Sequence, residues 1–374
     1  MTDRYDLIVV GAGIVGLSHA WVAASRGLSV CVVERDAACI GASIRNFGFV
    51  TVTGQPAGDT WRRAMRSRDV WAELAPQAGI AIEHRGLFLV AQRPAAAAVL
   101  EAFMRTTMAE RCELQSAREL ATNLPALRLA DASAVLYSPH ELRVESRSAI
   151  GRLAAWLQRA LGVDFRFGTT VQGVEAPRVF TSRGTLFADR VLICPGADYN
   201  ALKAESFDGH GLSLCQLQML RVRPEEGFRL PGAVMSDLSL VRYQGYAALP
   251  EAAALRAQLE DEESASLAHG IHLIVVQSAD GSLVVGDSHH YGAAPPPFAS
   301  DEVDELILRQ LRGTLDLAQA QVIERWVGSY PSSASEACVI EAPDDATRVV
   351  VVTSGTGAST AFGIAEDVFS GWPS

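Results

Sequence analysis

A glycine-rich turn near the N-terminus constrains the fold of this chain more than any other feature. An apolar run over residues 5–10 passes directly into Gly11-Ala12-Gly13-Ile14-Val15-Gly16, and a helical pattern follows. The first glycine permits a tight turn, the second lets backbone approach a pyrophosphate, and the third lets the helix pack closely on the strand. The first amides of the helix then point toward the anion.

A second apolar run, over residues 28–33, ends in Glu34. A carboxylate at this place accepts hydrogen bonds from ribose hydroxyls and repels a 2′-phosphate. An ordinary glycine-rich turn is the alternative interpretation. Strand, glycines, helix, second strand and acid together favour a dinucleotide site.

The composition limits the classes of partner. The chain has 374 residues, of which 49% are hydrophobic and 20% charged, as in soluble globular proteins. This length suffices for two domains with their own cores. The formal net charge of −11 argues against nucleic acid or an anionic membrane surface as partner. An acidic protein that binds an anion needs a local cluster of cations.

The six cysteines form no CxxC pair, and several lie in apolar runs, so we expect free thiols and a reducing cytoplasm. The first apolar run carries the glycine turn and is not a signal peptide. No stretch reaches the roughly 18 apolar residues that a membrane helix needs. We therefore expect a soluble cytoplasmic protein. The cysteines are Cys31, Cys39, Cys112, Cys194, Cys215 and Cys338.

Periodicity predicts the elements that follow. Helical spacing of apolar residues occurs over 60–77, 94–104, 148–161 and 301–315, and the acidic segment 251–267 is an exposed helix or loop. Strand-like runs occupy 87–90, 165–167, 169–171, 190–194, 212–222, 236–243 and 348–353. Residues 271–277 and 283–286, joined by Ala279-Asp280-Gly281-Ser282, predict a hairpin.

Three polar segments can belong to a site. The loop after Glu34 is rich in small residues and places a cation and an amide beside the far end of the cofactor, unless it is a mere connector. Residues 136–146 carry an arginine and two carboxylates, which favours an ion-pair network over a site. Residues 354–363 follow a buried strand and open a helix whose free amides can face an anion.

The glycine turn, Glu34 and the Gly41-Ala42-Ser43 loop together resemble the D-amino acid oxidase and glycine/sarcosine oxidase family of FAD enzymes. The resemblance implies an α/β fold with a discontinuous, Rossmann-like FAD-binding domain and a second, antiparallel-sheet substrate domain of α+β type. The FAD-binding domain is expected at 1–50, 145–205 and 325–374, and the substrate domain at 51–144 and 206–324.

The resemblance also implies non-covalent FAD, since no cysteine occupies the segment near Trp326 where sarcosine oxidases carry one. The expected cofactor-binding residues come from the glycine turn, the loop after Glu34, a short strand, two glycine turns and the C-terminal helix. They are Gly11, Gly13, Ile14, Val15, Gly16, Glu34, Arg35, Ala42, Ser43, Arg45, Asn46, Phe47, Gly48, Val171, Gly196, Gly328, Gly355, Thr356, Gly357, Ala358, Ser359 and Thr360.

Segments 42–49, 138–146, 286–291 and 354–366 are most similar to a subgroup linked to aminophosphonate breakdown. The implied substrate is 2-aminoethylphosphonate or its N-methyl derivative, oxidised to phosphonoacetaldehyde. Segment 324–331 departs from the family pattern, because Tyr330 stands where many members hold an amino-acid carboxylate with arginine. This departure puts an ordinary α-amino acid in doubt.

Flavin chemistry needs few protein groups. A flavin accepts a hydride from the carbon next to a neutral amine, and water hydrolyses the resulting imine. No residue must abstract a proton from carbon, so no catalytic residue is assigned, and O2 is the expected electron acceptor. The alternatives are an α-amino acid or N-methylglycine oxidase, a non-catalytic flavoprotein subunit, and a nicotinamide-dependent dehydrogenase. The oligomeric state stays open.

A phosphonate requires several donors, and planar arginines fit its oxygens best. A surface salt bridge is the commoner role of any single arginine, and the His289-His290-Tyr291 cluster is as readily structural as functional. Metal binding is not expected, because adjacent strand histidines point in opposite directions and no third ligand stands nearby. The substrate-binding candidates are Arg45, Arg242, Tyr243, His289, His290 and Tyr330.

Overall fold

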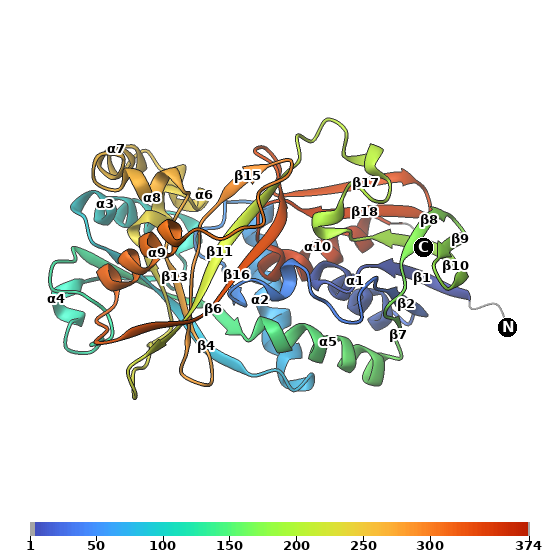
Figure 1. The fold of residues 1–374 in the computed structure, drawn as a ribbon, viewed down its shortest axis with the longest axis horizontal. Coiled ribbons are helices and arrows are strands. Elements are labelled where there is room, and N and C mark those ends of the chain that lie inside the picture. Colours follow the sequence, from blue (N-terminus) through green and yellow to red (C-terminus); the bar gives the residue numbers. More distant parts are fainter. Residues whose placement is uncertain (1–3, 373–374) are drawn as a thin grey trace.

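The computed structural model describes residues 4–372, which form two β-sheets side by side, each with its own helices (Figure 1). In Figure 1 the sheet with α1, α5 and α10 lies on the right, and the sheet with α3, α7, α8 and α9 lies on the left. The long strands β11 and β16 run beside the junction. Within the described residues, no helix is both long and apolar enough to cross a membrane.

The first sheet has a parallel centre, with β17 antiparallel at one edge and the antiparallel pair β8 and β9 joined to β10. Strand β1 lies between β10 and β2, and β10–β18 and β2–β7 are also parallel pairs. The sheet contains β1 (Arg4–Val10), β2 (Val30–Val33), β7 (Asp164–Arg166), β8 (Val171–Glu175), β9 (Arg178–Thr181), β10 (Gly184–Ile193), β17 (Cys338–Asp344) and β18 (Thr347–Val352). This is the expected Rossmann-like α/β architecture.

The second sheet is mostly antiparallel but mixed, because β12 pairs with β4 in parallel. The predicted hairpin is confirmed as β13 and β14. The sheet contains β3 (Phe49–Val50), β4 (Ile82–Ala91), β5 (Glu113–Ser116), β6 (Ala134–Val144), β11 (Ser213–Pro224), β12 (Ala233–Ser236), β13 (Ile274–Gln277), β14 (Leu283–Gly286), β15 (His290–Gly292) and β16 (Ala320–Ser332).

The helices predicted from periodicity are confirmed, including those over 60–77 and 301–315. They are α1 (Ile14–Ser25), α2 (Asp59–Gln77), α3 (Pro94–Phe103), α4 (Ala117–Leu120), α5 (Ser146–Leu161), α6 (Gln244–Ala247), α7 (Ala252–Glu262), α8 (Ser264–Ala268), α9 (Asp301–Thr314) and α10 (Gly357–Gly371). Phe362 of α10 packs edge-on against Trp21 of α1 and Trp71 of α2, with ring centroids 5.5 Å apart in each pair. The C-terminal helix therefore returns to the N-terminal glycine turn.

The predicted strand over 236–243 is wrong. β12 ends at Ser236, and Asp237–Val241 forms a 3-10 turn. Asp237 is buried and accepts hydrogen bonds from Arg93 Nη1 at 3.0 and 3.1 Å, which holds the start of the turn against the neighbouring segment. This turn delivers Arg242 and Tyr243 to the junction of the two sheets.

Sheet membership departs from the expected domain boundaries in the range 325–332. We assigned these residues to the FAD-binding domain, yet they belong to β16, which pairs with β11 of the second sheet over its length. The pairing runs across the expected boundary, with one register irregularity between Arg221 and Val222 of β11. The remaining domain boundaries stay a prediction.

Candidate functional site

A cavity of about 860 Å³ lies between the two sheets and is lined by residues from both. One end is formed by the N-terminal glycine turn and the loop around Ser43. The other end is formed by Arg242, His289 and their neighbours. The cavity brings together most of the predicted residues: Gly13, Ile14, Val15, Gly16, Ala42, Ser43, Arg45, Asn46, Phe47, Gly196, Arg242, Tyr243, His289, Gly328, Tyr330, Gly355, Thr356, Gly357, Ala358 and Ser359.

The glycine turn is built for close approach of backbone. Gly11 has a φ of +103°, and a Cβ on Gly16 would lie 1.9 Å from the Gly11 carbonyl oxygen, so a side chain is excluded there. The Glu34 carboxylate accepts hydrogen bonds from the amides of Ala12 (2.8 Å) and Asp36 (3.0 Å). Glu34 is only half-buried, so its carboxylate keeps room for hydroxyl partners.

The loop after Glu34 is anchored to the turn and is not a loose connector. Ile14 N donates to Ser43 Oγ at 2.9 Å, across the entrance of helix α1. Asn46 braces the loop, since its Nδ2 donates to Ala42 O at 2.8 Å and its Oδ1 accepts from Gly48 N at 2.7 Å. These contacts fix the backbone that lines this side of the cavity.

Arg45 is exposed and its side chain is already engaged, because Nε donates to Ile40 O at 2.8 Å. Its carbonyl accepts from Trp326 Nε1 at 3.1 Å, and a Cβ on Gly328 would lie 3.0 Å from that same oxygen. The position of Arg45 on the cavity wall is therefore set by backbone contacts with β16. Among the described residues, no carboxylate lies within ion-pair distance of its guanidinium.

The C-terminal segment closes the cavity from the first sheet. Gly355 has a φ of +71°, and helix α10 begins two residues later at Gly357. The side chain of Ser359 accepts a hydrogen bond from Thr51 N at 2.9 Å and so links α10 to the chain entering the second sheet. Thr360 is buried inside the helix and does not line the cavity.

Arg242 supplies a positive charge at the far end of the cavity. Its Nη2 donates to Tyr291 Oη at 3.1 Å, and Tyr330 lines the cavity beside it. Burial alone would lower the pKa of Arg242, but Tyr330, Tyr291 and Asp287 outweigh it and raise the pKa above its ordinary value. Arg242 is therefore a permanent cation on the cavity wall.

An acid–histidine cluster lies next to Arg242. Asp287, His272 and His289 are buried, and all three line the cavity. One carboxylate oxygen of Asp287 and one ring nitrogen of each histidine lie within 4.8 Å of one another. Asp287 Oδ1 lies 3.2 Å from His272 Nε2, and Oδ2 lies 3.6 Å from His289 Nε2. The two imidazole rings stack with centroids 5.3 Å apart.

The protonation of this cluster follows from burial and neighbouring charge. Burial lowers the pKa of His289 to about 3; Asp287 opposes this shift and Arg242 adds to it. Burial alone would raise the pKa of Asp287, but His289, His272 and Arg242 hold it below its usual value. At neutral pH the cluster therefore carries one carboxylate charge and neutral His289.

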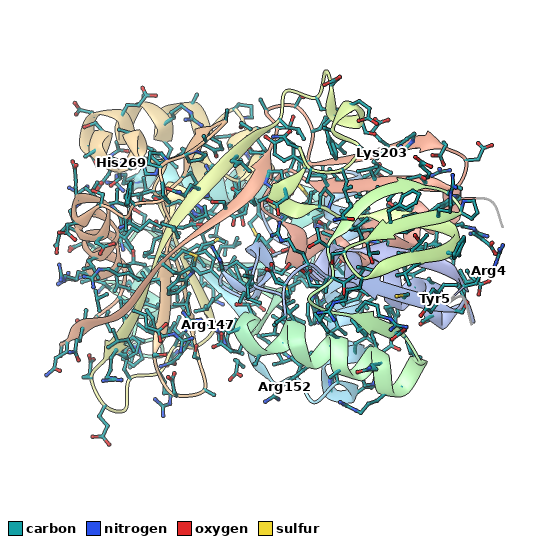
Figure 2. The ribbon with its side chains drawn as sticks, turned by 45° about the vertical axis from the view of Figure 1, so that its right-hand side comes forward. Arg4, Tyr5, Arg147, Arg152, Lys203 and His269 are labelled. Carbon is teal, nitrogen blue, oxygen red and sulfur yellow. The ribbon has the colours of Figure 1, made fainter. Side chains whose placement is uncertain are left out.

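Some predicted residues lie outside the cavity wall. His290 does not line it, and its Nε2 lies 3.0 Å from Nδ1 of His269, which directly follows helix α8 among the helices beside the second sheet (Figure 2). The expectation that His290 contacts substrate therefore lacks support, because adjacent residues of the chain face opposite sides. Arg35 pairs with Asp198 at 2.5 Å, and the other predicted residues outside the wall are Gly11, Glu34, Gly48, Val171 and Thr360.

Segment 136–146 forms the ion-pair network that its charges favour. Glu145 Oε2 accepts from Arg143 Nη2 at 3.0 Å, Arg221 Nη2 at 3.1 Å and Ser278 Oγ at 2.9 Å. Arg143 is fully buried. Glu145, Arg221 and Ser278 also line a second cavity of about 390 Å³ near Ile80, apart from the large one.

Sequence reasoning missed several residues of the large cavity, chiefly His272 and Asp287. Asp287 stands two residues before His289 in the chain, so its proximity is a visible signal. His272 stands in the first strand-like run of the predicted hairpin, and only the fold brings it to Asp287. Thr51 and Gln55 also line the cavity without any sequence signal.

The residues present fit a dinucleotide with a flavin. The turn at Gly11–Gly16 excludes side chains next to the start of α1, and the half-buried Glu34 carboxylate stands beside it. The cavity extends from this turn to Arg242 without leaving the junction of the sheets.

Comparison with known structures shows that this fold is shared. Glycine oxidase from Geobacillus kaustophilus superposes with a TM-score of 0.78 at 19% identity, covering 98% of this chain and 94% of that one. L-proline dehydrogenase from P. horikoshii superposes with a TM-score of 0.77 at 17% identity, covering 100% and 95%. At sequence identities of 17% and 19%, this structural similarity establishes the fold alone.

One known protein and one protein family are similar to this chain in sequence. D-amino acid dehydrogenase 2 of Mesorhizobium japonicum (strain LMG 29417 / CECT 9101 / MAFF 303099) is 38% identical over 72 residues, which span 18% of this chain and 17% of that protein. The family described as DAO, FAD dependent oxidoreductase, matches residues 6–369. FAD is the cofactor of this family, in agreement with the cavity and its glycine turn. The chain belongs to the DAO family of FAD-dependent oxidoreductases.

Proposed function

We propose that this protein oxidises a small amine that carries an anionic group, with an α-amino acid or N-methylglycine as the first candidate. The observation that carries the proposal is Arg242, a permanent cation on the cavity wall whose Nη2 bonds Tyr291 and which faces no carboxylate within ion-pair distance among the described residues. The activities named for glycine oxidase and D-amino acid dehydrogenase 2 support an amino acid as substrate.

The roles of the cavity residues belong to the same proposal. Gly11, Gly13, Gly16 and Glu34 hold the adenosine diphosphate part of FAD, which is bound non-covalently. The loop from Ala42 to Gly48 and the segment from Gly355 to Ser359 surround the flavin side. Among the described residues, 4–50, 145–205 and 325–372, apart from the β16 segment, form the FAD-binding domain, and the remainder forms the substrate domain.

The chain's own groups orient the substrate. FAD supplies the hydride-accepting chemistry when bound, and the protein positions the carbon next to the amine. Arg242 holds the anionic group, and the hydroxyl of Tyr291, already bonded to the guanidinium, limits how the anion can turn. Tyr330 packs against Gly355 and shapes the space between the anion and the ring. Water then hydrolyses the released imine, and O2 is the electron acceptor that we expect.

An aminophosphonate is the second candidate, and Tyr330 is the observation that favours it. The family resemblance leads us to expect a carboxylate-holding arginine at the position of Tyr330, whose side chain is a neutral phenol. Arg242 contributes its positive charge from a different element. A phosphonate has three oxygens, and Arg242, Tyr291 and Tyr330 offer three donor groups of suitable kind. 2-Aminoethylphosphonate and its N-methyl derivative are therefore included in the test.

The test is a panel of small amines scored by anaerobic flavin bleaching and by hydrogen peroxide. We expect glycine, sarcosine, a D-amino acid or 2-aminoethylphosphonate to bleach the flavin. Bleaching by no amine would contradict the proposal and favour a non-catalytic flavoprotein subunit. Flavin bands in the purified protein exclude a nicotinamide-dependent dehydrogenase.

The anion site is tested with Arg242→Ala. An arginine bonded to an anion by two parallel hydrogen bonds contributes about 1.5–3 kcal/mol, so the Michaelis constant should rise about tenfold or more with unchanged FAD content. Arg242→Lys should recover only part, since a point charge cannot reproduce the planar fork. The matched control is Arg118→Ala, which removes an exposed arginine of α4. An unchanged Michaelis constant in Arg242→Ala would contradict the proposed site.

A further inference from the structure

The Asp287 carboxylate lacks the donors that a buried charge requires. Its side chain is 6% exposed, and no hydrogen bond of good geometry reaches Oδ1, although His272 Nε2 lies 3.2 Å away. The contact from Oδ2 to His289 Nε2 is longer still, at 3.6 Å. A buried carboxylate is costly without charged or hydrogen-bonding partners. The cavity side of Asp287 is therefore short of a donor.

The tautomer of His289 makes this shortage greater. His289 Nδ1 lies 2.9 Å from the carbonyl oxygen of Gly270, and a carbonyl can only accept, so Nδ1 carries the proton. In a neutral imidazole the other nitrogen then bears a lone pair. His289 Nε2 and Asp287 Oδ2 consequently face each other as two acceptors, and both line the cavity.

A substrate ammonium group supplies what the pair lacks. An ammonium carries a positive charge and several N–H donors, and can bond a carboxylate and an imidazole at once. Arg242, which we propose holds the substrate anion, lines the same cavity as the pair, and its charge lowers the pKa of both Asp287 and His289. The positive charge of the guanidinium would repel a divalent metal ion bound at the pair. A substrate that carries both an ammonium group and an anionic group can therefore bind the Asp287–His289 pair and Arg242 at once.

We propose that Asp287 and His289 bind the ammonium group of the substrate and that His289 Nε2 takes its proton. This inference rests on the proposed function. An N–H bond of the ammonium breaks, an Nε2–H bond forms on His289, and the electron pair stays on the amine nitrogen. The amine becomes neutral, as hydride loss from the adjacent carbon requires. The imidazolium that forms is stabilised by Asp287.

The surrounding charges explain how His289 gains proton affinity when substrate binds. Asp287 favours the charged imidazole, whereas burial, Arg242 and neighbouring His272 oppose it. Pairing of Arg242 with the substrate anion reduces the repulsion from the guanidinium. Anion binding at Arg242 is therefore coupled to proton uptake at His289, across the same cavity.

The first test measures binding of unreactive probes to the holoenzyme by the change in flavin absorbance. 2-Amino-2-methylpropionate has no hydrogen on the carbon next to nitrogen, 2-methylpropionate lacks the amine, and tert-butylammonium lacks the anion. We expect wild type to bind the zwitterion about tenfold or more tightly than the amine-free anion. Asp287→Asn should bring this ratio close to one, and Arg242→Ala should weaken both anions while keeping the ratio.

A ratio unchanged by Asp287→Asn would overturn the inference. Failure of the proposed function has a different signature: tert-butylammonium still binds in an Asp287-dependent way, but the anionic group adds no affinity in wild type. Bound metal in purified wild type that is lost from Asp287→Asn would also overturn the inference, because the metal would occupy the lone pair of His289. FAD content and the melting temperature show that each variant is folded.

The second test separates proton transfer from binding, using the best reducing amine of the panel. Below the pKa of that amine, the rate constant of anaerobic flavin reduction in His289→Gln should rise about tenfold per pH unit, because only amine already neutral in water reacts. Wild type should vary much less with pH. His290→Gln, which changes the neighbouring residue outside the cavity wall, is the matched control and should behave like wild type. The same pH profile in His289→Gln and wild type would overturn the proton transfer.

Discussion

Gly355 lies directly against the ring of Tyr330: a Cβ on Gly355 would be 2.8 Å from Tyr330 Cζ and 3.0 Å from its hydroxyl oxygen. Gly355 also has a φ of +71°, which side-chain-bearing residues rarely adopt. The contact joins the loop that opens helix α10 to strand β16. It therefore couples the first sheet to a residue of the cavity wall.

Gly355→Ala is expected to move Tyr330 and to lower both FAD retention and the rate of flavin reduction. Two causes act together, a backbone strain of roughly 1–2 kcal/mol and the clash with the ring. Gly184→Ala is the matched control, because Gly184 has a φ of +114° but no atom within 4 Å of the new Cβ. Flavin absorbance after gel filtration measures retention, and equal losses in both variants would attribute the effect to φ alone.

Gly16→Ala should prevent stable FAD binding and lower the melting temperature. The new Cβ would lie 1.9 Å from the Gly11 carbonyl oxygen, so strand β1 and helix α1 must separate. Gly151→Ala in α5 is the control: the position is exposed and open, and alanine there should stabilise the helix by about 0.5–1 kcal/mol. A Gly16→Ala protein with full flavin content and wild-type melting temperature would contradict the close packing.

The glycine turn could be predicted from sequence because its requirements are local. Gly11 needs a positive φ and Gly16 needs an absent side chain, and both follow from a strand passing directly into a helix. Glu34 follows at the end of the next strand by the same logic. The positions of Arg242 and Tyr243 could not be predicted from local requirements. Both residues reach the cavity wall through the Asp237–Val241 turn and not through the strand that alternation predicts.

The His272–Asp287 contact could not be read from the predicted hairpin. Ile274 pairs with Gly286, so regular continuation would place Ser288 opposite His272 and would turn Asp287 and His289 to the other face. The regular pairing ends at Gly286, and the chain beyond it departs from the ladder. A one-residue change of face at a strand end depends on tertiary packing, which periodicity does not contain.

Glu34→Arg should reduce FAD retention, because it replaces an acceptor for ribose hydroxyls with a donor of opposite charge. It also removes the acceptor for the Ala12 and Asp36 amides. Dialysis of the purified variant, followed by the ratio of flavin to protein absorbance, measures the effect. Asp198→Ala is the control, since it breaks only the exposed pair with Arg35. Retention equal to wild type in Glu34→Arg would place the adenosine ribose elsewhere.

The pair of Glu145 with buried Arg143 should make part of the protein's stability depend on pH. Burial alone would raise the pKa of Glu145, but Arg143, Ser278 and Arg221 outweigh burial and hold it below the usual value. A depressed carboxyl pKa stabilises the folded state above the unfolded pKa of about 4.5, and this contribution disappears as the pH falls through the folded pKa.

The expected result is a difference in melting temperature between wild type and Glu145→Gln that is constant near neutral pH and shrinks below about pH 4.5. Arg143→Ala should destabilise more strongly, by about 3–5 kcal/mol, because it leaves the carboxylate with one arginine fewer and opens a buried space. Glu175→Gln, whose partner Arg178 is exposed, is the matched control and should shift the melting temperature little at any pH. A wild-type advantage over Glu145→Gln that grows as the pH falls would contradict the sign of the pKa shift.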